Sequence, residues 1–145
     1  MRPVTLLHIE NDANDVLLFQ HACIQAGMKV NHKVVADGAE ALAYLSSTDE
    51  KTKECPFPSI VVLDLNLPRV NGFDVLAWMR GEGRLRRLPV IVLTGSDQPQ
   101  DMQRAYDLGA NSYLVKPSEP ESLVALAKGI DQYWLSLNQL PSRPN

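Results

Sequence analysis

Short apolar runs alternate with longer amphipathic segments along the whole of this chain. The runs at residues 60–64 and 90–94 are apolar on both faces, which is typical of strands buried inside a parallel sheet. Three further apolar runs lie at residues 5–9, 32–36 and 112–115. The lengths of these runs and the turn residues around them predict five β-strands.

The segments after these runs have the spacing of amphipathic helices. The first segment carries four apolar residues on one face, Val16, Phe19, Cys23 and Ala26. Asp12 or Asn14 can cap its start, and Gly27 follows its end. The pattern predicts five helices, at residues 16–26, 39–45, 73–80, 99–108 and 118–137, and the polar residues 46–54 predict a loop.

The last predicted helix is long and carries an apolar stripe. We expect this stripe to face the sheet or a partner, and it consists of Leu123, Leu126, Ala127, Ile130, Trp134 and Leu137. Trp134 equally suits simple packing at the end of the core. Both interpretations stay open from the sequence.

Alternation of five strands with five helices predicts a single α/β domain. Such a chain forms right-handed crossovers, so the sheet is parallel and doubly wound, with helices on both faces. We expect one domain over residues 1–145, with a core at about 4–137 and a tail at 138–145. In open sheets of this kind, ligands bind beyond the carboxyl ends of the strands, where the strand order reverses.

Composition narrows the class of protein further. The formal net charge is −3 and the pI is about 5.5, which gives no general attraction to nucleic acid or anionic lipid. We expect neither a signal peptide nor a membrane span, because the N-terminal apolar run is short and turns acidic and no apolar stretch is long enough to cross a membrane. Cys23 and Cys55 are expected to be free thiols of a reducing compartment. These features predict a cytoplasmic protein. The basic stretch from Arg80 to Arg87 is interpreted as a solvated loop.

Polar residues follow the predicted strands at their carboxyl ends. They are Glu10, Asn11 and Asp12 after the first strand, Asp64 and Asn66 at the third, Thr94, Gly95 and Ser96 after the fourth, and Lys116 and Pro117 after the fifth. In a parallel sheet these ends share one edge, so several carboxylates gather there and repel one another. Such a cluster requires a cation, and ligands that are all oxygen suit magnesium.

This constellation resembles the receiver domain of two-component response regulators, over roughly Val4 to Leu137. The motifs are "IEND" after the first strand, "LDLNLPRVNG" around Asp64, "LTGS" after the fourth strand and "YLVKP" before the last helix. The resemblance implies the flavodoxin-like strand order 2-1-3-4-5. A narrower likeness is to the stand-alone receivers paired with bacterial phytochromes, which end in a long helix with an aromatic–Trp pair, here Tyr133 and Trp134.

The resemblance implies that Asp64 is a phosphoacceptor. Its carboxylate would take a phosphoryl group from a phosphohistidine on a sensor histidine kinase, for which a bacterial phytochrome is the candidate. Mg²⁺ would be held by Glu10, Asn11, Asp64 and the backbone carbonyl of Asn66. The protein would then be a phosphoacceptor signalling protein rather than an enzyme, promoting its own phosphorylation and slow dephosphorylation.

Further roles follow from the same resemblance. Lys116 would pair with the phosphoryl group, Thr94 would hydrogen-bond it, and Gly95 would leave space for it. Pro117 would follow a cis peptide bond. Thr94 and Tyr113 would form the switch that remodels the face of the fourth helix, fifth strand and fifth helix; Tyr113 could instead serve packing alone.

Asn11 departs from the family pattern, which has a second acidic residue there as a metal ligand. An amide offers a carbonyl oxygen but no charge, so magnesium binding should be weaker. Asp12 could compensate, unless the following helix directs it elsewhere. Asn11 also supports a rival interpretation, a pseudo-receiver that acts as an interaction module without phosphorylation.

Two unrelated classes of protein fit the residues less well. A haloacid-dehalogenase phosphatase needs a general acid two residues after the nucleophile, where Asn66 stands. A flavodoxin needs a loop rich in hydroxyls and glycine after the first strand, and "ENDAND" is acidic. We expect no output domain after the last helix, and its exposed apolar and aromatic residues would suit a kinase partner or a homodimer.

Overall fold

Five parallel strands in the order β2-β1-β3-β4-β5 form the centre of the computed structural model, which describes residues 4–48 and 54–142. The predicted fold class and strand order are confirmed. The strands are β1 (Thr5–Ile9), β2 (Asn31–Val35), β3 (Ile60–Leu63), β4 (Val90–Thr94) and β5 (Ser112–Val115). Of the predicted loop and tail, residues 49–53 and 143–145 lie outside the described range.

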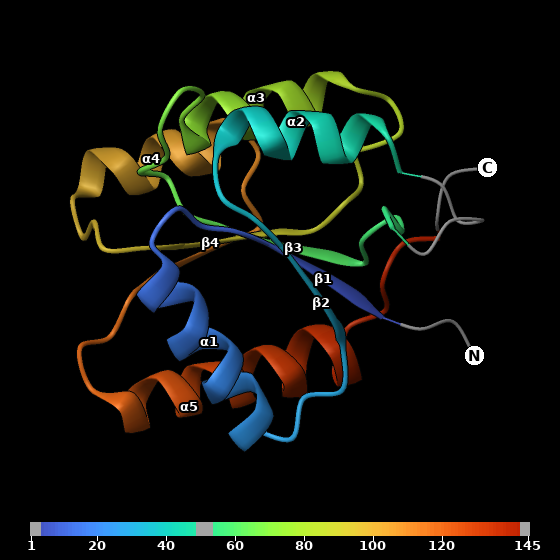
Figure 1. Ribbon diagram of the computed structural model, residues 1–145. Helices are drawn as coiled ribbons and strands as arrows, with labels where there is room; N and C mark the ends of the chain where they lie inside the picture. The colour runs from blue at the N-terminus through green and yellow to red at the C-terminus, as the bar shows by residue number, and fades with distance from the viewer. Residues whose placement is uncertain (1–3, 49–53, 143–145) are drawn as a thin grey trace.

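Helices cover both faces of this sheet (Figure 1). They are α1 (Ala13–Gln25), α2 (Gly38–Ser46), α3 (Gly72–Gly81), α4 (Pro99–Asp107) and α5 (Pro120–Ile130), which continues into the π-helix η1 (Asp131–Leu137). Helices α1 and α5 lie on one side, and α2, α3 and α4 lie on the other. None of the helices within the described ranges is both long and apolar enough to cross a membrane.

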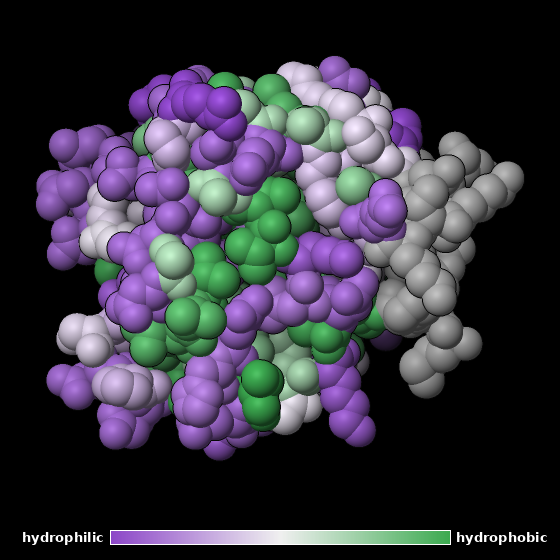
Figure 2. All heavy atoms as spheres, viewed as in Figure 1, coloured by the Kyte–Doolittle hydropathy of each residue, from purple (hydrophilic) through white to green (hydrophobic). Residues whose placement is uncertain are grey.

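Two apolar cores sandwich the sheet because its central strands are buried on both faces. Along β1, Leu6 packs with Phe19 on the α1 side, and Leu7 and Ile9 pack with Leu76 on the side of α2 and α3. All residues of β1, β3 and β4 are buried, whereas β2 and β5 at the edges are partly exposed. Apolar side chains are exposed at the surface where β2 forms the edge of the sheet, and the surface around them is mostly hydrophilic (Figure 2).

Side-chain caps set the starts of α1, α2 and α3, three of the helices that lead away from the carboxyl edge of the sheet. Asp12 caps α1, with its Oδ1 accepting from the amides of Asn14 at 2.9 Å and Asp15 at 3.1 Å. Asn71 caps α3 in the same way. The next residue, Gly72, lies so close to the backbone of Asp64 that a Cβ there would collide with it. Glycine is therefore required for this turn to pack beneath Asp64.

The last helix differs from its prediction at the C-terminal end. The stripe is buried at Ala127 and Ile130 and half-buried at Trp134, but Leu137 is 75% exposed. Over Asp131–Leu137 the hydrogen bonds lengthen to the i→i−5 pattern, as in the bond from the Asn138 amide to the Tyr133 carbonyl. The wider π turn rotates later residues away from the α-helical face, so Leu137 leaves the stripe.

The interpretation of Arg80 to Arg87 as a solvated loop is wrong for Arg80. Its Nε donates to the Gly109 carbonyl at 3.0 Å, and Nη1 donates to three carbonyls of the loop, including that of Leu88 at 2.9 Å. Its Nη2 donates to Oδ1 of Asn111 at 3.0 Å. The guanidinium therefore joins the end of α3 to the turn before β5.

Replacing Arg80 with lysine should destabilise the protein by about 2–4 kcal/mol. A single ammonium cannot reproduce the planar fork, so several partly buried carbonyls lose their donor. Urea unfolding would measure the loss, with Arg86→Lys on the exposed side of the same loop as the matched control. Equal stability of the two variants would contradict this role for Arg80.

The buried His8 of β1 and the half-buried His32 of β2 lie side by side. The rings of His8 and His32 are 6.1 Å apart, and Phe19 lies 4.7 Å from His8. Within the described residues, Nδ1 of His8 and Nε2 of His32 have no hydrogen-bond partner. Burial, followed by the charges of His32 and Lys116, lowers the pKa of His8 to about 3, and burial lowers that of His32. Both imidazoles are therefore neutral in the folded protein.

Acid should destabilise the fold through His8. The unfolded chain binds a proton at a pKa near 6.5 and the folded chain only near 3, so stability is complete above pH 6.5 and falls as the pH drops through that window. The loss from His8 between pH 7 and pH 5 is about 2 kcal/mol. Urea titrations at both pH values should show a smaller loss for His8→Leu than for wild type, by this amount.

The exposed His21 provides the control, because His21→Gln should keep the wild-type loss. Glu10, whose pKa is raised to about 6, contributes the opposite slope between pH 4.5 and 6, and it does so in all three proteins. An unchanged loss in His8→Leu would show that His8 is not the responsible group.

Candidate functional site: an acidic pocket at the carboxyl edge of the sheet

An open pocket of about 670 Å³ lies at the carboxyl ends of β1, β3 and β4. Its wall contains the polar residues predicted from the strand ends, which are Glu10, Asn11, Asp12, Asp64, Asn66, Thr94, Gly95, Ser96 and Lys116. The structure therefore brings these residues together. It adds two acids that the sequence did not single out, Asp15 and Asp101.

Asp64 is held rigidly at the end of β3. Its backbone amide donates to the Ile9 carbonyl at 3.0 Å, so the sheet extends to this residue, and Asp64 is only 5% exposed. The carboxylate Oδ1 accepts weakly from the Asn66 amide at 3.4 Å. Oδ2 faces the ammonium of Lys116 at 3.3 Å. The carboxylate thus points into the pocket from a fixed backbone.

Lys116 is the cation at the centre of the acids. Its Nζ donates to Oε1 of Glu10 at 2.6 Å, Oδ2 of Asp15 at 2.8 Å and Oδ2 of Asp64 at 3.3 Å. Burial opposes the charge on Lys116, but its hydrogen bonds to Asp15 and Glu10 outweigh burial and raise its pKa. Burial raises the pKa of Glu10 to about 6, against the hydrogen bond from Lys116. The ammonium and the three acids therefore form one charge cluster.

Asp15 was missed because its role depends on how α1 leaves the sheet. It lies in the first turn of α1, and that turn brings its carboxylate over the end of β5. The only sequence signal was its distance from Glu10, which places it one helical turn beyond the strand end. Asp101 was missed for a similar reason: it lies in the first turn of α4 and accepts from Oγ of Ser96 at 2.6 Å.

Asp12 does not take the place of the acid that position 11 lacks. Its Oδ1 accepts from two amides as the cap of α1, and its own amide donates to Oε2 of Glu10 at 3.1 Å. Asn11 is exposed at the rim of the pocket. The sequence allowed Asp12 either to cap the helix or to replace the missing acid, and the structure shows it as the cap of α1.

The opposite wall is formed by the end of β4 and by β5. Thr94 is 2% exposed, and no atom of the described residues lies within 4 Å of a Cβ built on Gly95, so the pocket is open there. The half-buried Tyr113 donates its hydroxyl to the Ser96 carbonyl at 2.9 Å. The cis bond expected before Pro117 is wrong: this peptide bond is trans, the isomer that X–Pro bonds favour intrinsically.

The donors in the pocket fit a small divalent cation. Within the described residues no group of three or more His, Cys, Asp or Glu side chains has the arrangement of a metal site. Magnesium does not need one, since it keeps several waters and binds through one or two carboxylates. Glu10 and Asp64 supply two carboxylates, and Asn11 and the Asn66 carbonyl supply neutral oxygens. Both carboxylates contact Lys116, so that contact must loosen when a cation binds.

Comparison with known proteins identifies the family. Residues 6–128 match the response regulator receiver domain, and the chain belongs to this family. It is a signalling class whose members receive phosphoryl groups from histidine kinases and bind a divalent metal ion.

Individual relatives match over nearly the whole chain. Response regulator Rcp1 of Synechocystis is 33% identical over 97% of this chain and 95% of its own length. A probable methanogenesis regulatory protein of Methanothrix harundinacea, FilR2, is 36% identical over 96% of this chain and 88% of its own. The phosphorylated cyanobacterial phytochrome response regulator RcpA superposes with a TM-score of 0.87 at 34% identity, covering 97% of this chain and 100% of RcpA.

Proposed function

We propose that this protein is a stand-alone receiver that accepts a phosphoryl group from a sensor histidine kinase onto Asp64. A carboxylate oxygen of Asp64 attacks phosphorus as the P–N bond of the donor phosphohistidine breaks. The imidazole leaves and an acyl phosphate forms. The observation that carries this proposal is the placement of Asp64, whose carboxylate is fixed at the end of a buried strand, beside an ammonium and an open pocket.

Charge neutralisation is the main requirement of this transfer. We propose Mg²⁺ as the divalent ion, with Glu10, Asn11, Asp64 and the Asn66 carbonyl as its ligands; when bound, it would neutralise charge on the phosphoryl oxygens. An Mn²⁺-bound structure of Rcp1 supports a divalent ion. Lys116 and Thr94 approach the phosphoryl position from the far wall, where Lys116 pairs with it and Thr94 donates a hydrogen bond.

Tyr113 is the proposed switch residue that reports on phosphorylation. It lies next to the β4–α4 loop, bonded to Ser96 two residues after Thr94. A movement of Thr94 toward the phosphoryl group changes the position of that loop, and the face of α4, β5 and α5 changes with it. Tyr106 and Val115 are exposed on these elements, at 51% and 40%, and are the residues through which a partner would detect the change.

The proposed donor is a phytochrome-type histidine kinase, as the description of RcpA suggests. Tyr133 and Leu137, 53% and 75% exposed at the end of the last helix, form the surface that we assign to self-association.

Acetyl phosphate with Mg²⁺ should add the mass of one phosphoryl group to the wild-type protein and none to Asp64→Asn. The substitution keeps the size of the side chain and removes the nucleophile. Intact-mass spectrometry measures the outcome, and Asp74→Asn on the exposed side of α3 is the control that should still be phosphorylated. Phosphorylation of Asp64→Asn would overturn the assignment, and an unmodified wild type would favour the pseudo-receiver.

Restoring an acid at position 11 should lower the Mg²⁺ requirement. In Asn11→Asp we expect the half-saturating Mg²⁺ concentration for phosphorylation to fall roughly 3- to 10-fold, because a second charged ligand joins Glu10. The control is Asn14→Asp, which adds the same charge on an exposed part of α1. Equal Mg²⁺ requirements for wild type and Asn11→Asp would show that the missing carboxylate is not limiting.

A further inference from the structure

Three carboxylates from three different elements take up the three N–H donors of Lys116. Glu10 follows β1, Asp64 follows β3, and Asp15 lies in the first turn of α1. Glu10 and Asp64 are also the carboxylates placed to hold a cation. Asp15 pairs with Lys116 but is not one of the proposed metal ligands. The same ammonium thus contacts the two carboxylates among the proposed metal ligands and one acid that is not a ligand.

This arrangement makes Lys116 a competitor of the cation. A carboxylate oxygen that accepts a short hydrogen bond from an ammonium is less available to a metal ion. The competition matters more here because Asn11 brings no charge, so the cation relies on Glu10 and Asp64. A partner that holds the ammonium away from these two acids would favour the cation.

We infer that Asp15 is a positioning residue that holds Lys116 toward α1, which leaves Asp64 available to the cation and gives the ammonium another acceptor when Glu10 turns to that cation. This inference rests on the proposed function. Nζ lies 2.8 Å from Asp15 and 3.3 Å from Asp64, and its shortest contact, 2.6 Å, is to Glu10, so Asp15 and Glu10 together draw the ammonium away from Asp64. Asp15 is itself held in place, because Oδ1 of the Asp12 cap accepts from its amide at 3.1 Å.

Space is available on the α1 side for the ammonium. A cavity of about 40 Å³ lies there, lined by His8, Glu10, Asp15, Leu18 and Lys116 among others. The side chain of Asp15 is 35% exposed, so water helps to stabilise its charge. Glu10 is only 2% exposed and lacks this contact with water. Asp15 therefore remains an acceptor for Lys116 when Glu10 turns to a metal ion.

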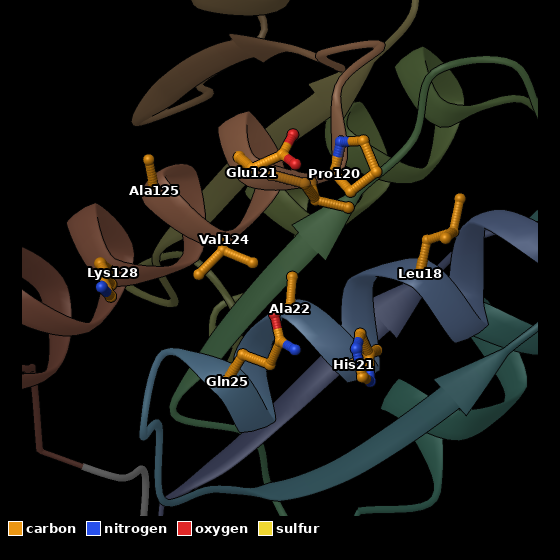
Figure 3. Close-up of a pocket in the computed structure, with 10 residues that line it drawn as sticks. Leu18, His21, Ala22, Gln25, Pro120, Glu121, Val124, Ala125 and Lys128 are labelled. Atoms are coloured by element: carbon orange, nitrogen blue, oxygen red, sulfur yellow. The ribbon is translucent and has the colours of Figure 1, made fainter.

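A broader groove of about 540 Å³ between α1 and α5 begins one turn further along α1 (Figure 3). Its wall, from Leu18 and His21 to Pro120 and Val124, is separate from the charge cluster. Substitutions at Asp15 therefore act on the pocket of Asp64 without removing a residue that lines this groove.

The test is the Mg²⁺ dependence of phosphorylation by acetyl phosphate in Asp15→Asn. Without the charge of Asp15, the ammonium shifts onto Glu10 and Asp64. We expect the half-saturating Mg²⁺ concentration to rise roughly 3- to 10-fold, with the rate at saturating Mg²⁺ within about twofold of wild type. Asp15→Glu should retain most of the wild-type Mg²⁺ affinity.

Asp12→Asn is the matched control. It removes the same charge from the wall of the same pocket, and asparagine still caps α1. We expect it to change the Mg²⁺ requirement less than Asp15→Asn does. An equal change in both variants, or no change in Asp15→Asn, would overturn the inference, as would a fall in maximal rate at an unchanged Mg²⁺ requirement.

A second readout needs neither metal nor phosphorylation. Lysine ammonium protons held in hydrogen bonds exchange slowly enough for ¹⁵N–¹H NMR, and the Lys116 signal is assigned by its loss in Lys116→Arg. We expect that signal at the same chemical shift in metal-free wild type and Asp12→Asn, and at a changed chemical shift in Asp15→Asn, where Glu10 and Asp64 hold the ammonium without Asp15. An unchanged Lys116 signal in Asp15→Asn would overturn the inference, whereas failure of wild-type phosphorylation with the expected NMR result would overturn the proposed function.

Discussion

The ion pairs of Lys116 with Glu10, Asp15 and Asp64 balance the charges that the parallel sheet concentrates at one edge. Parallel strands all end on the same side, so acids at the ends of β1 and β3 are brought together whatever their distance in the sequence. Lys116 links residues that are 52 to 106 positions away along the chain. Because Glu10 and Asp64 are nearly inaccessible to water, removing the ammonium would leave buried negative charges without a partner.

Under the proposed function, the same cluster would let the site respond to phosphorylation. In that proposal the carboxylates of the unmodified pocket would bind two cations in turn, the ammonium of Lys116 and a metal ion from the solvent. A phosphoryl group on Asp64 brings more negative charge than either cation balances alone. The ammonium and the metal ion would then be needed at the same time, and the carboxylates that each could bind would have to divide between them. A pocket whose carboxylates can bind either an ammonium or a metal ion would therefore change its geometry when its charge changes.

The sequence predicted the parts of the structure that depend on local pattern. The strands at 5–9, 90–94 and 112–115 have the predicted bounds because apolar runs flanked by turn residues define them. The pocket residues could be predicted because strand ends in a parallel sheet share an edge.

The features that the sequence did not predict depend on how elements far apart in the sequence pack together and on a local change in helix geometry. Asp15 reaches Lys116 only through the direction of α1, Arg80 binds carbonyls that a loop and a turn present to it, and Leu137 leaves its stripe through a π turn.

Ser96 links the pocket to α4 and β5, the elements of the face that the proposed switch would change. Its carbonyl accepts from Tyr113, and its hydroxyl donates to Asp101 in the first turn of α4. Thr94 is two residues away on a short loop that contains Gly95, so a displacement of Thr94 reaches Ser96 through two peptide units. From Ser96 it passes to β5 through Tyr113 and to α4 through Asp101. Under the proposed function, one displaced hydroxyl at the phosphoryl position would therefore move β5 and α4 together, because both are bonded to Ser96.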